Sequence, residues 1–592
     1  MHALEQEVKL DTGPGWHVPD LEGVLPGSSV GRPEVLQLDA VYYDTDDAAL
    51  GRHRMTLRLR SERVDGGEPV RQWTLKLPAP ASGEVEARTE VNREVPEGPL
   101  STPEEVPPGV PADISGLVTA ATLGHHLHPV AHLSTVRERR RVTTSDGRLL
   151  AEVDHDSVTG TNLLLAARGH PAATVTFCEV EVELAPGAAL ETATAIVERL
   201  MAAGARRSDR HSKVGTVLER TDSSGRAGPG LSPGQAPDGA PGGRARELVR
   251  RQAGDCLSVL AQTEPYIKLG DPGPEHVHKA RVATRRTRAV LRALARAGAA
   301  RGQATATSSG AAHGAGAEGQ LVEELQWLGQ VLGRARDAEV RLGSLERLRA
   351  SLRPEDSEGA EELVALARAD HQAARADLVL ALHSERYLGA VQALAAVAES
   401  PEAGGLAGPL GAQPARTVAA VLVASQWRSV RRALRAAAQG TTDQQLHRAR
   451  IKTKQLRYLA ELAGTTLDRR KDRRHAQETA LLATDLQDLL GELHDSQVMS
   501  GWLARAAARC PAGAAPAEAP GPPPGDGAPG QAEEAVPDGP PTPAPVVAGL
   551  LLAAVRREQV DLGRRWPLAW KRLERQAPGR RARRDAGARA EH

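Results

Sequence analysis

Charged residues occupy every second position in several segments of the first third of the chain. In LEQEVKL, residues 4–10, they are Glu5, Glu7 and Lys9. Successive side chains of a β-strand point to opposite faces, so these three would share one face of a strand. The same alternation recurs in RMTLRLR, QWTLKL, ARTEVNREV, VRERRRV, LAEVDHDSV and FCEVEVEL. The pattern predicts a set of strands that each have one apolar face and one charged face.

The charges on these expected strands are largely sorted by sign, with cations in some segments and carboxylates in others. Two interpretations are open. One is a solvated face with incidental ion pairs. The other is a sheet that closes around a charged interior, while helices such as the amphipathic segment 190–204 cover its apolar outer face. The density of charge favours the closed sheet, because a solvated face usually mixes Ser, Thr and Gln with its charges.

A charged interior of this kind would suit a metal-bound oligophosphate. Clustered Arg and Lys side chains bind phosphate oxygens, and clustered Asp and Glu side chains bind hard divalent cations. The pattern GxxxxGK[ST] is absent from the sequence, which argues against a nucleotide hydrolase of the Walker type. No Ser/His/Asp or Cys/His nucleophile arrangement stands out.

The motif ExExK, formed by Glu5, Glu7 and Lys9, resembles the signature of the CYTH superfamily, the triphosphate tunnel metalloenzymes. The later segments YYDTDDAAL, LRLR, WTLKL, ARTE, the Arg-rich strand, AEVDHD, EVEVEL and HSK follow in the family's order. The resemblance covers most of residues 1–220. It implies an antiparallel eight-stranded β tunnel with covering helices, which binds triphosphate and hydrolyses or cyclises it with Mg²⁺ or Mn²⁺.

The resemblance also implies roles for individual residues. The residues that match the metal-binding glutamates are Glu5, Glu7, Glu179 and Glu181. The residues that match the phosphate-binding set are Lys9, Arg58, Arg60, Lys76, Arg88, Arg139 and Lys213. The expected catalytic residues are Glu5, Glu7, Lys9, Glu152 and Asp156, where the last two form an acidic pair that holds a second metal or orients water. Glu90 is expected to contribute to the acidic side. Further residues of the same parity, given less weight, are Arg137, Arg141, Asp154 and Glu183.

The composition of the rest of the chain changes after about residue 220. At 592 residues, two to four domains are expected. The segment 221–243 is rich in Gly, Pro and Ser and is expected to be a flexible linker. Segments of helical period then run over about 244–576, interrupted by low-complexity inserts at 300–320 and 510–545, and a basic tail at 577–592 is expected to be disordered. The fold class expected is therefore α+β multidomain, with an all-α C-terminal domain.

The helical region contains an internal duplication. HKARVATRRTRAVLRAL matches HRARIKTKQLRYLAEL at an offset of 169 residues, and LGRARDAEV matches LGELHDSQV. The matched basic positions are His278, Arg281, Arg285 and Arg288, and His447, Arg450, Lys454 and Arg457. At about 100° per residue, each set falls within about 80° of one helix face, in a stripe about 15 Å long. A single stripe would favour a solvated face, whereas two in the same register favour a binding surface.

These helix pairs resemble the CHAD domain. The resemblance implies two four-helix halves related by a pseudo-twofold axis, with a basic pore or groove between them that binds inorganic polyphosphate. A flexible polyanion requires spaced cationic donors on a rigid support, which the eight matched residues would supply. The histidines are open to three interpretations, namely pH sensing, donation to phosphate and structural packing. Asp337 and Asp495 are expected to pair with Arg side chains.

The function expected is metal-dependent hydrolysis of inorganic triphosphate or short polyphosphate by an enzyme that also binds polyphosphate. The alternatives are a non-catalytic protein of polyphosphate granules, and a thiamine triphosphatase or adenylate cyclase that uses the same tunnel. Nucleic acid is a poor candidate partner, because no aromatic residue interleaves with the first stripe.

The location expected is the cytoplasm, with association with polyphosphate granules. The three cysteines are far apart and odd in number, and no leader segment or long apolar run is recognised. Metal preference, chain-length preference and oligomeric state stay open.

Overall fold

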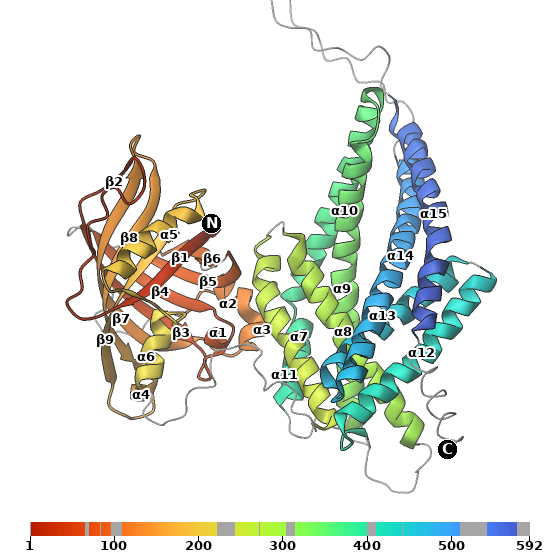
Figure 1. The fold of residues 1–592 in the computed structure, drawn as a ribbon, viewed down its shortest axis with the longest axis horizontal. Coiled ribbons are helices and arrows are strands. Elements are labelled where there is room, and N and C mark those ends of the chain that lie inside the picture. The colour runs from red at the N-terminus through yellow and green to blue at the C-terminus, as the bar shows by residue number, and fades with distance from the viewer. Residues whose placement is uncertain are drawn as a thin grey trace, which may run out of the picture. The chain divides into compact units, whose positions relative to one another are not determined.

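The structure is a computed structural model, and it describes residues 2–64, 70–82, 85–95, 109–221, 243–270, 273–302, 314–399, 410–440, 442–509 and 542–576. The chain divides into two compact units (Figure 1). The first comprises Met1–Gln235 and Ser258–Asp271, and the second comprises Ala236–Leu257 and Pro272–His592. No described helix is both long enough and apolar enough to cross a membrane. The expected linker at 221–243 and the expected disordered tail at 577–592 lie almost wholly outside the described residues.

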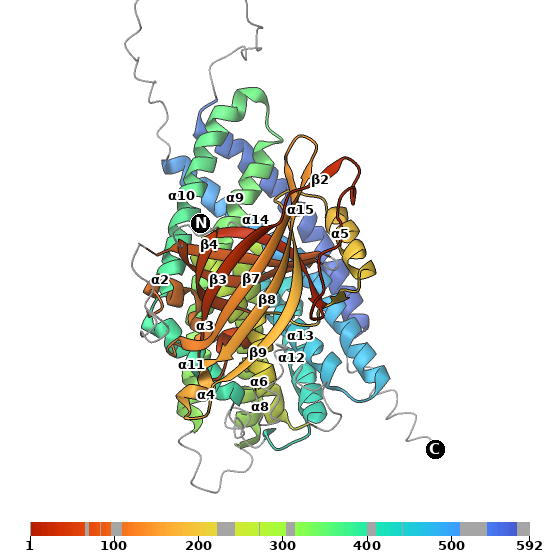
Figure 2. The ribbon, with the colours of Figure 1, turned by 90° about the vertical axis from the view of Figure 1, so that its left-hand side faces the viewer.

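The first unit is built on a sheet that closes on itself. Its strands are β1 (His2–Thr12), β2 (Ser28–Val30), β3 (Glu34–Asp44), β4 (Thr56–Val64), β5 (Val70–Ser82), β6 (Val85–Glu94), β7 (His128–Thr144), β8 (Leu149–Asn162), β9 (Ala173–Leu184) and β10 (Arg206–Arg207). Eight of them follow the order β1-β6-β5-β4-β3-β7-β8-β9, and β9 pairs back with β1. All these pairs are antiparallel. Figure 2 shows β3, β7, β8 and β9 running side by side.

The apolar faces of the strands point outward and are covered by helices. Leu10, Val153 and Val182 have no exposed surface and pack in one cluster with Ile196 and Leu200 of α5 (Leu190–Ala202). A second cluster packs on α6 (Lys213–Thr221) and joins Val217 to Val158 and Phe177, which have the same parity as Asp156 and Glu179 on their strands, so α6 lies against the inner face of the sheet. Short helices complete the unit: α1 (Ala49–Arg52), α2 (Ala112–Ser115), η1 (Gly116–Val118), α3 (Thr119–Thr122) and α4 (Leu163–Ala167). The expected closed sheet, with its charged face inward and α5 over its apolar face, is confirmed.

Helix α6 approaches the sheet closely because β8 carries a glycine beneath it. A Cβ atom at Gly160 would lie 2.2 Å from Cγ2 of Val217, a separation that no side chain can adopt without movement. Glycine inside a strand often marks such an approach of another element. Gly160 therefore fixes how near α6, and Lys213 at its start, can lie to the tunnel.

The second unit is all helical. Its elements are α8 (Pro274–Gly302), α9 (Gly314–Arg349), η2 (Pro354–Asp356), α10 (Ser357–Leu382), α11 (Glu385–Glu399), α12 (Ala415–Gln439), α13 (Asp443–Thr466), α14 (Arg470–Arg509) and α15 (Ala544–Arg575). α7 (Ala245–Lys268) begins in this unit, whereas its second half belongs to the first unit. The duplicated segments form equivalent pairs, because α8 packs on α9 as α13 packs on α14. A Thr442–Gln445 capping box fixes the start of α13.

One of the expected inserts is partly ordered. We expected residues 300–320 to be a low-complexity insert, yet α8 extends to Gly302 and α9 already begins at Gly314. Extending an existing helix is far easier than starting one, and the segment contains alanine, which has the best helix propensity. Composition alone therefore overestimated the length of this insert. Residues 303–313 and 510–541, which make up most of the two inserts, lie outside the described residues.

The packing of α10 generates a test of the helical unit. A Cβ atom at Gly359 would lie 2.4 Å from the Thr542 carbonyl oxygen and 2.8 Å from the Ala544 nitrogen, whereas a Cβ at Gly389 of α11 would meet nothing within 4 Å. We expect Gly359→Ala to lower the free energy of unfolding by about 1–3 kcal/mol through overpacking. The matched control Gly389→Ala should raise it by about 0.5–1 kcal/mol, because alanine favours the helix. Urea denaturation followed by far-ultraviolet circular dichroism measures both, and equal effects would contradict the packing described.

Candidate functional site

The interior of the closed sheet holds a cavity of about 200 Å³ with a polar lining. Its lining residues are Glu5, Lys9, Tyr42, Thr56, Arg58, Arg60, Lys76, Arg88, Glu90, Arg137, Arg139, Glu152, Glu181, Glu183, Ser212 and Lys213. Eight of these are Lys or Arg and five are Glu. Cations thus outnumber carboxylates among the lining residues, although Glu7, Asp154, Asp156 and Glu179 pair with some of these cations from just outside the lining. The clustered Arg and Lys side chains favour a polyanionic ligand.

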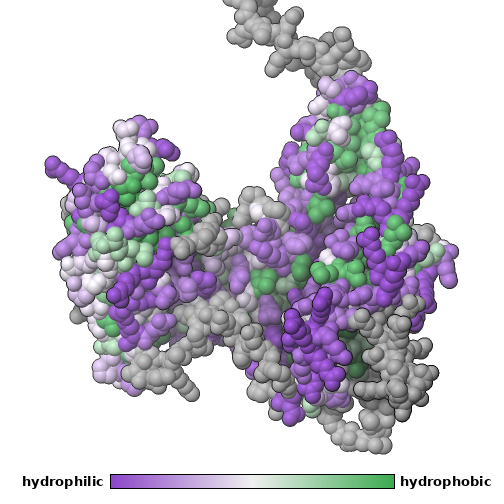
Figure 3. Space-filling model, viewed as in Figure 1, coloured by the Kyte–Doolittle hydropathy of each residue, from purple (hydrophilic) through white to green (hydrophobic). Residues whose placement is uncertain are grey.

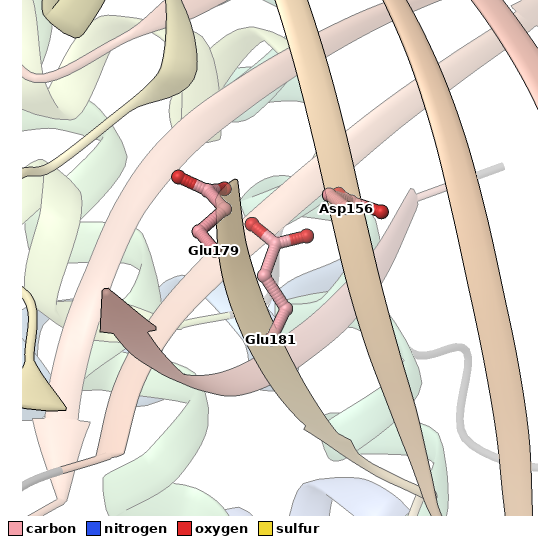
Figure 4. A group of neighbouring side chains, drawn as sticks. All are labelled: Asp156, Glu179 and Glu181. Atoms are coloured by element: carbon pink, nitrogen blue, oxygen red, sulfur yellow. The ribbon is translucent and has the colours of Figure 1, made fainter. Parts of the chain in front are cut away.

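An acidic corner, defined as Asp156, Glu179 and Glu181, lies beside this cavity. Asp156 comes from β8 and the two glutamates from β9, and their carboxylate oxygens lie within 4.8 Å of one another (Figure 4). Strand pairing causes the cluster, because Asp156 is directly opposite Glu179. Three buried carboxylates are suitable donors for a hard divalent cation such as Mg²⁺ or Mn²⁺.

Lys213 neutralises the acidic corner. Its Nζ lies 3.0 Å from Asp156 Oδ2, 2.6 Å from Glu179 Oε1 and 2.8 Å from Glu181 Oε1. Burial opposes its charged form, but the three carboxylates hold the pKa of Lys213 well above its usual value. Burial likewise opposes ionisation of Glu181, and Lys213, Lys9 and Arg137 hold its pKa well below the usual value. Arg137 and Lys9 pair with carboxylates of the same corner, so three cations hold it together, while burial raises the pKa of Glu179.

The arginine column of β7 pairs with the acidic column of β8. The register places Arg137 opposite Asp156, Arg139 opposite Asp154 and Arg141 opposite Glu152. The buried Arg137 donates through Nε to Asp156 at 2.8 Å, through Nη2 to Asp156 at 2.7 Å and to Glu181 at 2.9 Å, and it also binds Asp154. Arg139 binds Asp154 at 2.8 Å and Glu152 at 2.9 Å. Glu152 thus lies among arginines, and Asp156 is grouped with the β9 glutamates.

The residues of the ExExK motif lie on β1, which pairs with β9 next to the acidic corner, and they are also ion-paired. Lys76 Nζ lies 2.7 Å from Glu5 and 3.0 Å from Glu90. Lys9 Nζ lies 3.2 Å from both Glu7 and Glu181, so it links this strand to the acidic corner. The remaining predicted cation here, Arg88, lies 3.5 Å from Glu7. Glu7 is buried, with 2 % of its surface exposed.

Arg58 and Arg60 form a cationic wall with few carboxylate partners. Arg58 Nη1 donates to the Tyr42 hydroxyl at 3.4 Å, and Arg60 Nη2 lies 3.2 Å from Glu62. Burial and the neighbouring Arg58 lower the pKa of Arg60 to about 10. Repulsion between like charges is relieved when an anion binds between them, so this wall is suited to phosphate oxygens.

Three lining residues were not predicted from sequence, namely Tyr42, Thr56 and Ser212. Tyr42 is directly opposite Arg58 in the β3–β4 register. Burial opposes its ionisation, whereas Arg58 and Lys213 lower the pKa of Tyr42. Once the register of the strands that contain YYDTD and LRLR was known, the position of Tyr42 opposite Arg58 could have indicated that its side chain faces the tunnel. Glu90, expected on the acidic side, and Arg137 and Glu183, which were given less weight, line the cavity as well.

The duplicated basic residues of the helical unit lie together. Arg281 Nη2 pairs with Asp337 at 2.9 Å, and the equivalent Arg450 Nη2 lies 3.7 Å from Asp495. Each guanidinium lies over the glycine of its facing helix, since a Cβ at Gly333 would lie 3.8 Å from Arg281 and one at Gly491 3.9 Å from Arg450. The duplicated LGxxxD segment therefore positions the first arginine of each stripe.

The two stripes converge electrostatically. Burial and the neighbouring Arg285, Arg450 and Arg281 lower the pKa of Lys454 to about 7. Burial and Arg281 lower the pKa of Arg285 to about 10. Because each group is influenced by cations of the other stripe, residues 169 positions apart in sequence form one basic cluster, defined as Arg281, Arg285, Arg450 and Lys454.

The outer members of the stripes have other environments. Burial and Arg292 lower the pKa of Arg288, and Arg457 lies 3.6 Å from Glu461. The two histidines have different neighbours. The ring centroid of His447 lies 4.8 Å from that of His494. The position equivalent to His494 in the first half is Arg336, whose charge, after burial, lowers the pKa of His278. Burial is the largest cause of the lowered pKa of both His278 and His447.

Comparisons with known proteins agree with this architecture. The family model of the CYTH domain matches residues 3–208, and that of the CHAD domain matches residues 251–504. The Mycobacterium tuberculosis protein MT2285 is 30% identical over 511 residues, which cover 84% of this chain and 87% of that protein.

Two solved structures are similar to parts of the chain. The CHAD domain from the plant Ricinus communis is 26% identical and covers 45% of this chain and 81% of its own, with a TM-score of 0.34. PptA from Streptomyces chartreusis is 17% identical and covers 56% of this chain and 100% of its own, with a TM-score of 0.37. The domain matches and the full-length relative show that this chain belongs to the family of proteins in which a CYTH domain is followed by a CHAD domain.

Proposed function

We propose that the first unit is a metal-dependent hydrolase of inorganic triphosphate or short polyphosphate. The observation that carries this proposal is the acidic corner next to a cavity of about 200 Å³ whose lining consists of charged and hydroxyl-bearing side chains. An inorganic phosphate chain can use every part of such a lining. A substrate with a large organic group would have to bury that group against ions, which is unfavourable.

The residues divide into two functional groups. Asp156, Glu179 and Glu181 would hold the divalent cation, which supplies Lewis-acid activation of phosphate and water when it is bound. Arg58, Arg60 and Arg139 would bind the phosphate oxygens and offset the negative charge on the departing phosphate. Lys213 lies at the border of the two groups, so its ammonium can exchange carboxylate oxygens for phosphate oxygens while it stays in the tunnel.

We further propose that the basic cluster of the helical unit binds polyphosphate. Burial lowers the pKa values of Arg285 and Lys454, and repulsion among the four cations lowers them further. Binding of a polyanion would relieve this repulsion, and it needs no base-specific contacts. Because both units belong to one chain, polyphosphate held by the helical unit would be at a raised local concentration for the tunnel.

Removal of one corner carboxylate tests the hydrolase. We expect Glu181→Gln to lower kcat for tripolyphosphate by about 10²–10³-fold, because several kcal/mol of transition-state stabilisation are lost with the metal. The matched control is Glu138→Gln, since Glu138 lies on the opposite face of β7 and pairs with Arg140. Phosphate release from tripolyphosphate, ATP and thiamine triphosphate is measured with Mg²⁺ and with Mn²⁺. Full activity of Glu181→Gln, or a preference for either organic substrate, would contradict the proposal.

Neutralising the basic cluster tests polyphosphate binding. We expect Arg285→Ala with Lys454→Ala to weaken binding of long-chain polyphosphate and to reduce the slope of log K against log salt by about 1–2, because two phosphate contacts are lost. The control is Arg428→Ala with Arg431→Ala, two exposed arginines of α12. Titration calorimetry at several salt concentrations measures both. An unchanged slope in the first double variant would exclude the cluster as the binding surface.

Lys454 also predicts a dependence on pH. With a pKa of about 7 it is largely neutral above pH 8 in the free protein, and a bound polyanion favours its charged form. Affinity for long-chain polyphosphate should therefore rise as pH falls from 8.5 to 6, by at most about tenfold per pH unit for one proton. Lys454→Arg should flatten the profile, because arginine stays charged throughout. A profile that stays equally steep in this variant would show that another group titrates.

A further inference from the structure

The helical unit contains a second cavity, of about 510 Å³, which is larger than the one in the tunnel. It is lined by α8, α9, α13, α14 and α15 and has two chemically different ends. Its polar end includes Arg281, Arg285 and Arg450 of the basic cluster. Its other end is apolar and extends along the long helices. Figure 3 shows hydrophobic surface next to hydrophilic surface along these helices.

The polar end brings the guanidinium groups of Arg281, Arg285 and Arg450 beside the carboxylates of Asp337, Glu492 and Asp495. Arg281 and Arg450 have the partners Asp337 and Asp495, which are both about half exposed. Arg285 has no carboxylate within ion-pair distance among the described residues. The Nε atoms of Arg281 and Arg450 are buried without a hydrogen-bond acceptor among the described residues. This end is therefore ready to accept phosphate oxygens.

The apolar end is formed by Val340, Leu348, Val498, Met499 and Val555. Met499 and Val555 are buried, with 6 % and 3 % of their surface exposed. Arg341 and Arg347 also line this part of the cavity, but a purely inorganic chain would lose hydration against the apolar side chains. An organic group would instead remove apolar surface from water, which is favourable.

The duplication explains why the cavity lies where it does. Val340 and Val498 are equivalent positions of the two halves, as are Asp337 and Asp495, and all four line the same cavity. The next equivalent pair is Ser344 and Trp502. Trp502 is buried and donates through Nε1 to Asp370 at 2.8 Å, whereas Ser344 lines the cavity. The small serine leaves open on one side the space that an indole fills on the other.

We propose that this cavity binds a nucleoside phosphate, with its phosphates at the basic cluster and its nucleoside against the apolar end. The volume lies within the range of about 300–1,000 Å³ typical of sites for organic ligands. Polar groups among the apolar ones, namely Ser344, Arg347 and Glu558, suit the edges of a base or sugar better than they suit an acyl chain. The inference rests on the proposed binding of phosphate by the basic cluster and adds an organic portion to the ligand.

The test compares ATP with tripolyphosphate by titration calorimetry, without metal ions. The full chain carries Arg58→Ala and Arg60→Ala, so that anion binding in the tunnel is weakened. We expect ATP to bind at least about fivefold more tightly than tripolyphosphate, because the nucleoside buries apolar surface. Ser344→Trp should remove this advantage while it leaves tripolyphosphate affinity within about twofold, since it changes only the apolar end. Val498→Asp places a new negative charge in the cavity and should weaken binding of both anions, but it should weaken binding of ATP more, because ATP also loses its apolar contact. Arg285→Ala should weaken the binding of both ATP and tripolyphosphate.

The matched control is Val560→Asp, because Val560 is an exposed valine of α15 outside the cavity lining. It should leave both affinities unchanged, and circular dichroism verifies that each variant is folded. Equal affinity for ATP and tripolyphosphate, or an equal loss of both in Val498→Asp, would overturn this inference and leave the polyphosphate proposal standing. Tighter binding of decyl phosphate than of ATP would overturn it in favour of a lipid-like ligand. If ATP, tripolyphosphate and decyl phosphate all fail to bind, both proposals are overturned.

Discussion

The neutralisation of opposite charges across neighbouring strands is the interaction on which the tunnel depends. A closed sheet with a charged interior is stable only if its ions are paired, because an isolated buried charge is very unfavourable. The strand order provides this pairing, since the arginines of β7 lie directly opposite the carboxylates of β8. The same order brings Asp156 next to the β9 glutamates, where the carboxylates outnumber the cations that their own strands supply. The carboxylates of that corner are therefore the groups that are suited to hold a divalent cation.

The alternation of residues determined how much of the first unit could be predicted. The parity of Glu5, Glu7 and Lys9 indicates which side chains share a face, but it does not indicate which strands are neighbours. For that reason the closed sheet was foreseen, whereas the pairing of Glu152 with arginines was not. Tyr42 was missed because a tyrosine in an apolar strand has no charge to mark its face. Which of the predicted residues bind metal or phosphate stays a prediction.

In the helical unit, sequence repetition carried more information than composition. The shared spacing of His278 and His447 identified equivalent helices and, through them, the cations that the structure brings together. Composition misled at residues 314–320, because a stretch of small residues can extend an established helix. Positions at which the two duplicated halves carry different residues could not be interpreted before the packing of the helices was known. Ser344 in place of a tryptophan is one such departure, and it matters only because both positions adjoin one cavity.

The close contact between Gly160 and Val217 lies on the inner face of the sheet, because Gly160 has the same parity as Asp156 on β8. Val217 lies one helical turn after Lys213 on α6, so the fit of its side chain against β8 determines where the ammonium group of Lys213 lies. The hydrogen atom that glycine carries in place of a methyl group thus helps to set the electrostatic balance of the acidic corner one helical turn away. In this protein, the absence of one carbon atom at position 160 therefore influences where the positive charge of Lys213 lies.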